Sequence, residues 1–103
     1  MNSRIVNMEH VLAPIGAAEE LAVDDAVVQA AALNEKAQYA RLSVKGNAVR
    51  MTLDGTDPVS EGAGEILAAG SVTYLSKRAL SAAQFIESVA GSDGIVRIQG
   101  MYE

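Results

Sequence analysis

The chain has 103 residues, which fits one domain near the size at which a single hydrophobic core becomes self-sufficient. Half of the residues are apolar, but one Phe, three Tyr and no Trp leave a thin core of small aliphatic side chains that a partner subunit would stabilise. Cysteine is absent, which excludes disulfides and thiolate metal sites, and the net charge of −5 argues against a nucleic-acid partner.

The first 16 residues contain a short apolar segment that we treat as a separate N-terminal element. Its apolar residues are Ile5, Val6, Met8, Val11 and Leu12. The segment is typical of a strand of the protein's own sheet, or of an extended arm that adds to the sheet edge of a neighbour. It is too short for a signal peptide, and no run reaches the ~20 apolar residues of a membrane span. We therefore expect a protein made in the cytoplasm, with no membrane partner.

Residues 17–33 are Ala-rich and can be interpreted in two ways. Acidic residues near the start, Glu19 and Glu20, suit the first turn of a helix. The apolar residues, however, do not form a continuous stripe, because Asp25 lies on the face that a helix would bury. Two strands, around residues 21–23 and 26–31, fit the pattern better. In both interpretations residues 17–103 form a single domain.

Residues 38–53 alternate between apolar and polar side chains, as half-buried strands do. Ala40 and Leu42 share the apolar side of the first predicted strand with Val44. The outward positions of that strand are Tyr39, Arg41, Ser43 and Lys45. A Gly-Asn pair at residues 46–47 tolerates positive φ, and the alternation resumes after it. The pattern predicts a β-hairpin.

The following Asp54-Gly55-Thr56-Asp57-Pro58 stretch ends the second strand, because Asp bonds backbone amides, Gly permits positive φ and Pro lacks a ladder donor. A flexible loop is expected from there to residue 65. Further strands are predicted at residues 66–67, 71–75 and 95–102.

Residues 80–89 fit either a helix or a turn followed by a strand at residues 84–87, and an all-β neighbourhood favours the strand. Turn and strand signals thus recur about every ten residues. The sequence predicts an all-β fold, a small sandwich or barrel of immunoglobulin-like or jelly-roll-like form with about seven strands.

Candidate chemistry is sparse. His10 is the single histidine, so any imidazole-based triad would depend on it. A Gly-Ala-Gly stretch at residues 62–64 lacks the third glycine and the lysine of a phosphate loop. Four carboxylates that could hold a hard cation occupy the predicted loop, at Asp54, Asp57, Glu61 and Glu65. Their spacing matches no calcium loop, and turn chemistry explains them. We expect no enzyme, no cofactor and no metal site.

Four stretches carry a further pattern: residues 49–58 (Val-Arg-Met-Thr-Leu-Asp-Gly-Thr-Asp-Pro), residues 64–70 (Gly-Glu-Ile-Leu-Ala-Ala-Gly), Phe85-Ile86, and residues 96–102 (Val-Arg-Ile-Gln-Gly-Met-Tyr). They resemble small β-sandwich proteins encoded among the structural genes of tailed bacteriophages and prophages. There an Arg-containing strand enters an Asp-Gly-Thr-x-Pro turn, a Leu-x-x-Gly step follows, and a Phe-Ile strand precedes a last strand ending in aromatics. The resemblance covers residues 38–102. The chain departs from the pattern in its Tyr102-Glu103 ending and in residues 79–83.

The resemblance implies a virion structural protein, first of all a capsid decoration or cement protein. Such a protein would stabilise the head by binding the major capsid protein or other virion proteins, and would form homo-oligomers. A neck, tail or baseplate accessory protein is one alternative. Another is an immunoglobulin-like carbohydrate-binding module, because those modules share the Asp-Gly-Thr-x-Pro turn. The predicted interface residues are Ile5, Val6, Met8, Val11, Leu12, Asp54, Thr56, Asp57, Glu61 and Glu65.

Overall fold

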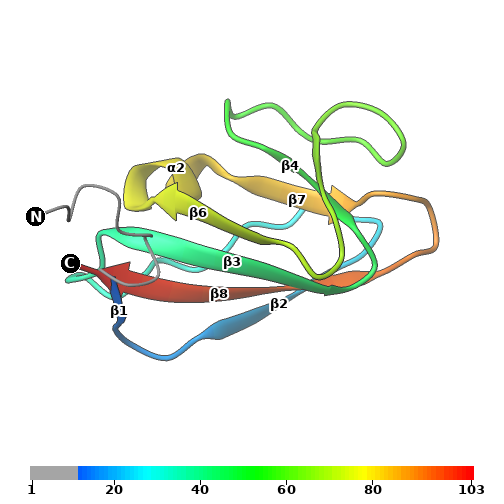
Figure 1. Cartoon of the computed structure of the whole chain (residues 1–103). Helices are drawn as coiled ribbons and strands as arrows, with labels where there is room; N and C mark the ends of the chain where they lie inside the picture. Colours follow the sequence, from blue (N-terminus) through cyan, green and yellow to red (C-terminus); the bar gives the residue numbers. More distant parts are fainter. Residues whose placement is uncertain (1–11) are drawn as a thin grey trace, which may run out of the picture.

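The computed structural model describes residues 12–103, which form eight strands and one short helix (Figure 1). The strands are β1 (Ala13–Pro14), β2 (Glu19–Val23), β3 (Tyr39–Gly46), β4 (Val49–Thr52), β5 (Glu65–Leu67), β6 (Val72–Ser76), β7 (Gln84–Glu87) and β8 (Gly94–Tyr102), and the helix is α2 (Lys77–Ala82). They form a five-stranded and a three-stranded antiparallel sheet. The predicted all-β fold is confirmed, with a strand number close to that expected.

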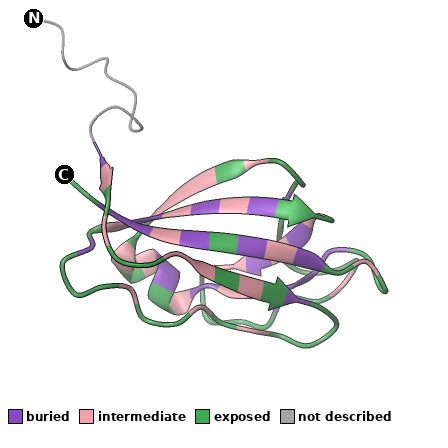
Figure 2. Ribbon diagram, turned by 90° about the horizontal axis from the view of Figure 1, so that it is seen from below, coloured by how far each residue is buried: buried purple, intermediate pink, exposed green. Residues whose placement is uncertain are grey.

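Strand β8 is the centre of the five-stranded sheet. It pairs with β3 on one side and with β1 and β2 on the other, and β6 extends the sheet beyond β3. Leu42 of β3 lies opposite Ile98 of β8, and both side chains are buried. In Figure 2, which views the molecule from the side of this sheet, buried positions alternate with more exposed ones along the strands. One face of the sheet therefore packs on the core, and the other faces outward.

The three-stranded sheet has the order β5-β4-β7 and covers the other side of the core. Met51 of β4 lies opposite Phe85 of β7, and both are buried. Side chains from the two sheets form one cluster: Val23, Ala40, Leu42, Val44, Val49, Met51, Leu67, Leu80, Ala83, Phe85, Val96 and Ile98. The molecule is therefore a two-layer sandwich, and its core is built mainly from aliphatic side chains.

The predicted hairpin over residues 38–53 is wrong in its pairing. The buried faces of both strands are as predicted, except that Leu53, predicted to point inward, lies beyond β4 and is 41% exposed. However, β3 pairs with β6 and β8, whereas β4 pairs with β5 and β7. The chain crosses between sheets at Gly46, which has φ +83°. Gly94 lies opposite Gly46, and a Cβ on Gly94 would collide with the carbonyl oxygen of Asn47 and lie 2.9 Å from Cγ1 of Val49. Two glycines thus let the chain leave one layer for the other.

Residues 17–33 contain one strand and no helix. Strand β2 spans the first of the two predicted strands and pairs with β8 along its whole length. Around residues 26–31 the chain forms a single bridge, in which Val28 and Phe85 exchange two backbone hydrogen bonds of 2.9 Å. The second predicted strand is thus reduced to one bridge.

Residues 77–87 contain both a helix and a strand. The backbone amide of Ala79 donates to the Ser76 hydroxyl at 3.0 Å, which caps the helix α2, and Leu80 buries its side chain in the core. The chain then becomes extended at Ala83 and enters β7. The strand predicted at residues 84–87 is confirmed, and the helix precedes it.

Candidate functional site

The N-terminal part of the predicted interface is described at one residue only. Outside the described residues lie His10 and four predicted interface residues, Ile5, Val6, Met8 and Val11. Leu12 is buried, with 7% of its surface exposed. It directly precedes β1, which pairs with the end of β8. Leu12 therefore packs within the chain itself.

The remaining predicted interface residues are exposed: Asp54, Thr56, Asp57 and Glu61 lie between β4 and β5, and Glu65 begins β5. Asp54 Oδ1 accepts hydrogen bonds from the hydroxyl of Thr56 at 2.6 Å and from its backbone amide at 3.1 Å. These hydrogen bonds, the hydroxyl first, hold the pKa of the Asp54 carboxyl below its ordinary value. Gly55 between them has φ +86°, so the turn predicted from the sequence is confirmed.

Residues 53–64 form a loop that side-chain hydrogen bonds anchor to the rest of the protein. Arg50 Nη1 donates to the carbonyl oxygen of Gly62 at 2.9 Å, and the Ser60 hydroxyl donates to the carbonyl oxygen of Glu87 at 3.0 Å. Pro58 is buried. Because Arg50 lies between two buried residues of β4, its side chain points away from the core. The loop therefore covers the outer face of the three-stranded sheet with its carboxylates exposed.

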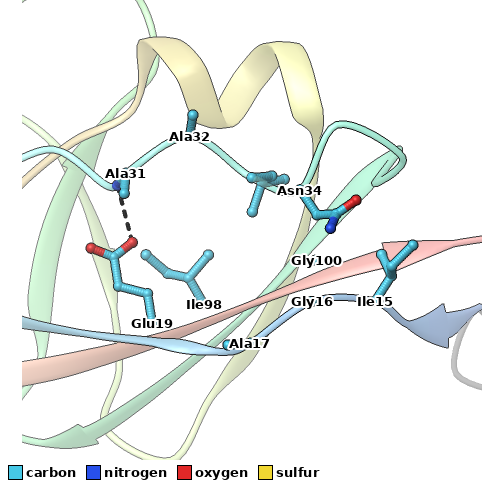
Figure 3. A pocket seen from close by; sticks show the side chains of 10 residues that line it. Ile15, Gly16, Ala17, Glu19, Ala31, Ala32, Asn34, Ile98 and Gly100 are labelled. Carbon is cyan, nitrogen blue, oxygen red and sulfur yellow. Dashed lines mark hydrogen bonds between the residues drawn. The ribbon is translucent and has the colours of Figure 1, made fainter.

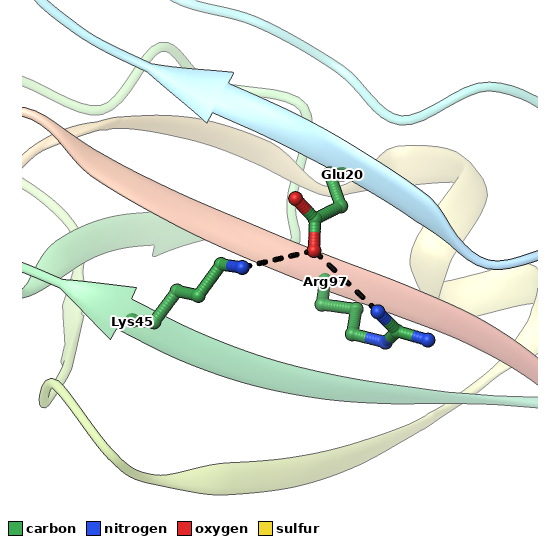
Figure 4. Close-up of polar contacts among 3 residues, drawn as sticks. All are labelled: Glu20, Lys45 and Arg97. Atoms are coloured by element: carbon green, nitrogen blue, oxygen red, sulfur yellow. Dashed lines mark hydrogen bonds and ion pairs between the residues drawn. The ribbon is translucent and has the colours of Figure 1, made fainter.

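An ion-pair cluster lies on the outer face of the five-stranded sheet (Figure 4). Oε2 of Glu20 lies 3.0 Å from Nζ of Lys45 and 3.5 Å from Nη1 of Arg97. The hydrogen bond and charge of Lys45, with a smaller contribution from Arg97, lower the pKa of the Glu20 carboxyl. Strands β2, β8 and β3 each contribute one of the three residues.

The same outer face carries a fourth charged side chain. Arg41 shares the outward side of β3 with Lys45 and lies opposite Gln99 of β8 and Tyr74 of β6. The face thus presents three cations and one carboxylate in a chain with 13 acidic and 8 basic residues. The loop on the opposite side presents three carboxylates, of Asp54, Asp57 and Glu61, beside the single cation of Arg50 on the outer side of β4. The two outer faces of the sandwich therefore carry opposite charge.

Sequence reasoning did not identify this charged face as a site. The alternation predicted that Arg41 and Lys45 point outward, which the structure confirms. The contribution of Glu20 and Arg97 depends on the β2–β8 and β3–β8 pairings, which no local pattern specifies.

A cavity of about 370 Å³ lies beside β2 and β8, under the segment of residues 31–34 (Figure 3). Ile98, Ala31 and Ala32 supply apolar walls. The carboxylate of Glu19 at its rim already accepts a hydrogen bond from the amide of Ala31 at 3.0 Å. The cavity therefore offers apolar surface and a carboxylate that is already engaged by the backbone.

Three further observations concern chemistry that the sequence raised. Within residues 12–103, no three His, Cys, Asp or Glu side chains come together as a metal site would require. No helix in that range is long and apolar enough to cross a membrane. Tyr39, Tyr74 and Tyr102 lie on three different strands, and the hydroxyl of Tyr74 is buried without a partner among the described residues.

Comparisons with known protein families, with curated proteins and with solved structures gave no match to this chain.

Proposed function

We propose that this protein is a bacteriophage virion structural protein, first of all a capsid decoration or cement protein that binds the major capsid protein or other virion proteins. The observation that carries the proposal is the pair of oppositely charged outer faces on one small sandwich. The anchored loop presents exposed carboxylates, and the five-stranded sheet presents Arg41, Lys45 and Arg97. Charged faces steer the association of protein partners that carry the complementary charge, and they fix how the two partners are positioned relative to each other.

The resemblance of residues 38–102 to phage structural proteins supports the same proposal. Its Asp-Gly-Thr-x-Pro turn is held by the two hydrogen bonds between Asp54 and Thr56, and its Pro58 is buried. The turn thus sets the course of the chain that carries the exposed carboxylates.

The size and core of the domain fit a protein that acts in many copies. Exposed ion pairs each contribute little, about 0–1 kcal/mol. Contacts repeated on a symmetric lattice nevertheless give high avidity, and binding to the folded state stabilises a small aliphatic core. Assembly would therefore compensate for the weakness of each single contact.

Mass spectrometry of particles purified from a lysogen that encodes the chain tests the proposal. We expect the protein to co-purify with heads. Reversal of two cations, in the double variant Lys45→Glu and Arg97→Glu, should reduce the retained amount about tenfold or more, because it creates like-charge contacts. The matched control is Lys36→Glu, an exposed lysine away from the sheet face, which should be retained as the wild type is.

Separation of heads from tails before the measurement distinguishes the position in the virion. Retention on tails alone would replace the decoration role by a neck or tail role. A protein that is abundant in the lysate but absent from every particle fraction would refute the virion proposal.

A further inference from the structure

Among residues 12–103, strand β6 forms an open edge of the five-stranded sheet. It pairs with β3 on one side and ends the order of strands on the other. Its residues are Val-Thr-Tyr-Leu-Ser, with no charge and no proline. Uncharged, regular edge strands are templates for pairing with another chain, and folded proteins usually block them.

The other edge strands in the described part of the chain are blocked in recognisable ways. Strand β1 is two residues long and contains Pro14, and β2 carries Glu20 among its charged residues. Strand β5 has three residues and begins with Glu65, and β7 is closed by the bridge to Val28. Strand β6 is thus the edge without such protection.

Two hydrogen bonds define which backbone groups of β6 face β3. The amide of Val44 donates to the carbonyl oxygen of Ser71 at 3.1 Å, and the amide of Lys77 donates to the carbonyl oxygen of Gln38 at 3.0 Å. Hydrogen-bonded and non-hydrogen-bonded pairs alternate along an antiparallel ladder. Every second residue of β6 therefore bonds to β3.

Thr73 and Leu75 are the residues of β6 that bond to β3 by this alternation. The amide and carbonyl groups of Val72 and Tyr74, and the amide of Ser76, point to the open edge. Within residues 12–103 these amides donate to no other group in the hydrogen bonds found. The edge therefore presents a regular row of free donors and acceptors.

We propose that two copies of this chain dimerise by antiparallel pairing of β6 with β6 about a twofold axis at Tyr74. In this register Tyr74 of one copy faces Tyr74 of the other, and Val72 faces Ser76. The facing Tyr74 residues can exchange two hydrogen bonds, and in each Val72–Ser76 pair the amide of Ser76 can donate to the carbonyl oxygen of Val72, since the carbonyl of Ser76 belongs to the N-cap of α2. A twofold contact of this kind joins the two five-stranded sheets into one continuous sheet.

The side chains of β6 are compatible with such a dimer. Tyr74 lies on the outer face, opposite Arg41, so the two tyrosine rings would be cross-strand neighbours. On the core side, the half-buried Leu75 of one copy would meet Thr73 of the other. No charged residue lies on β6, so no like charges face each other even though the chain is acidic. The side chain of Val72, which is 41% exposed in a single copy, would become less exposed in the dimer.

Sedimentation equilibrium of the full chain tests the dimer. We expect the wild type to dimerise and Val72→Lys to raise the dissociation constant about tenfold or more, because a lysine on an edge strand opposes pairing. The matched control is Val89→Lys, a 50% exposed valine in the turn before β8, which should dimerise as the wild type does. Amide hydrogen exchange of the unmodified protein gives a second measurement. The amides of Val72 and Tyr74 should become slower to exchange as concentration rises.

A wild type that stays monomeric at millimolar concentration would overturn the inference. So would a dimer that Val72→Lys leaves intact while the amides of Val72 and Tyr74 exchange as free groups. The inference goes beyond the proposed function and does not depend on it. A monomer can decorate a capsid, and a dimer can form outside a virion. Loss from particles would therefore refute the virion proposal alone, and a monomer in sedimentation would refute the dimer alone.

Discussion

Glu87 Oε1 accepts a hydrogen bond from the backbone amide of Gly91 at 3.0 Å, while Oε2 of the same carboxylate is buried without a partner in the described part of the chain. Glu87 lies opposite Val49 and is only 2% exposed. Burial of a carboxylate oxygen without a hydrogen bond costs free energy. The turn that leads from β7 to β8 is thus held by a buried carboxylate of which only one oxygen accepts a hydrogen bond.

The variant Glu87→Gln should raise the free energy of unfolding by about 1 kcal/mol. The amide keeps a carbonyl oxygen for Gly91 and removes the carboxylate. Urea unfolding at pH 7 measures the change. Glu87→Ala is the control and should destabilise, because it also deletes the bond to Gly91. A clear loss of stability in Glu87→Gln would contradict the expectation.

Phe85→Ala should lower the free energy of unfolding by about 3–5 kcal/mol. Phe85 is the single phenylalanine, is fully buried and packs with residues of both sheets, so truncation leaves a large cavity. Thermal or denaturant unfolding measures the loss. Val89→Ala, at an exposed position, should stay within about 0.5 kcal/mol of the wild type. A small effect at Phe85 would mean that the two layers do not share one core.

The buried faces of the strands could be predicted from the sequence, but their neighbours could not. Alternation correctly placed Ala40 and Leu42, and then Val49 and Met51, in the core. Alternation records the environment of a side chain and carries no information on which strand lies beside it. The crossing between layers depends on Gly94, which lies far along the chain and admits the carbonyl of Asn47 only because it lacks a Cβ.

The charged face could be predicted only in part for the same reason. Lys45 belongs to a clear strand pattern, whereas Glu20 belongs to an Ala-rich stretch in which helix and strand signals compete. The contact between them spans two strand pairings in the five-stranded sheet. Likewise, the carboxylates of residues 54–65 were visible as a group, but the bond from Arg50 to Gly62 that anchors their loop was not.

Removal of the Arg50 side chain should loosen the loop of residues 53–64. Arg50 donates to the carbonyl oxygens of Gly62 in the loop at 2.9 Å and of Ser88 after β7 at 3.3 Å, so Arg50→Ala deletes the side chain that links the loop to the end of β7. Limited proteolysis within the loop should become about tenfold faster, as local opening becomes easier. The cleavage rate of Arg50→Lys should lie between the rates of the wild type and of Arg50→Ala. Arg78→Ala, at an exposed arginine on α2, is the control. Equal cleavage rates in all four proteins would show that the loop is held in another way.

The pH dependence of stability should report the ion pairs of Glu20. The pKa of this carboxyl is lowered in the folded protein from its ordinary value of 4.5, first by Lys45 and then by Arg97. A carboxyl whose pKa falls on folding stabilises the protein above its unfolded pKa, and this contribution disappears as pH falls through the folded value. The wild type should therefore be slightly more stable than Glu20→Gln at pH 7.

The difference between these two proteins should decrease as pH falls below 4.5, should vanish once pH is below the lowered pKa of Glu20, and should shrink in 1 M salt because the pairs are exposed. Unfolding midpoints measured from pH 7 to pH 3 would test this. A difference that stays constant across the range would show that the carboxylate charge of Glu20 is not responsible.

The proposed function depends on the outer face of the five-stranded sheet as a surface that contacts other proteins. The most direct measurement is a cryo-EM reconstruction of particles from a lysogen that encodes the chain. We predict density for the sandwich on the particle, with Lys45 and Arg97 facing another protein chain. Particles without this density, or a bound sandwich whose five-stranded sheet faces only solvent, would contradict it.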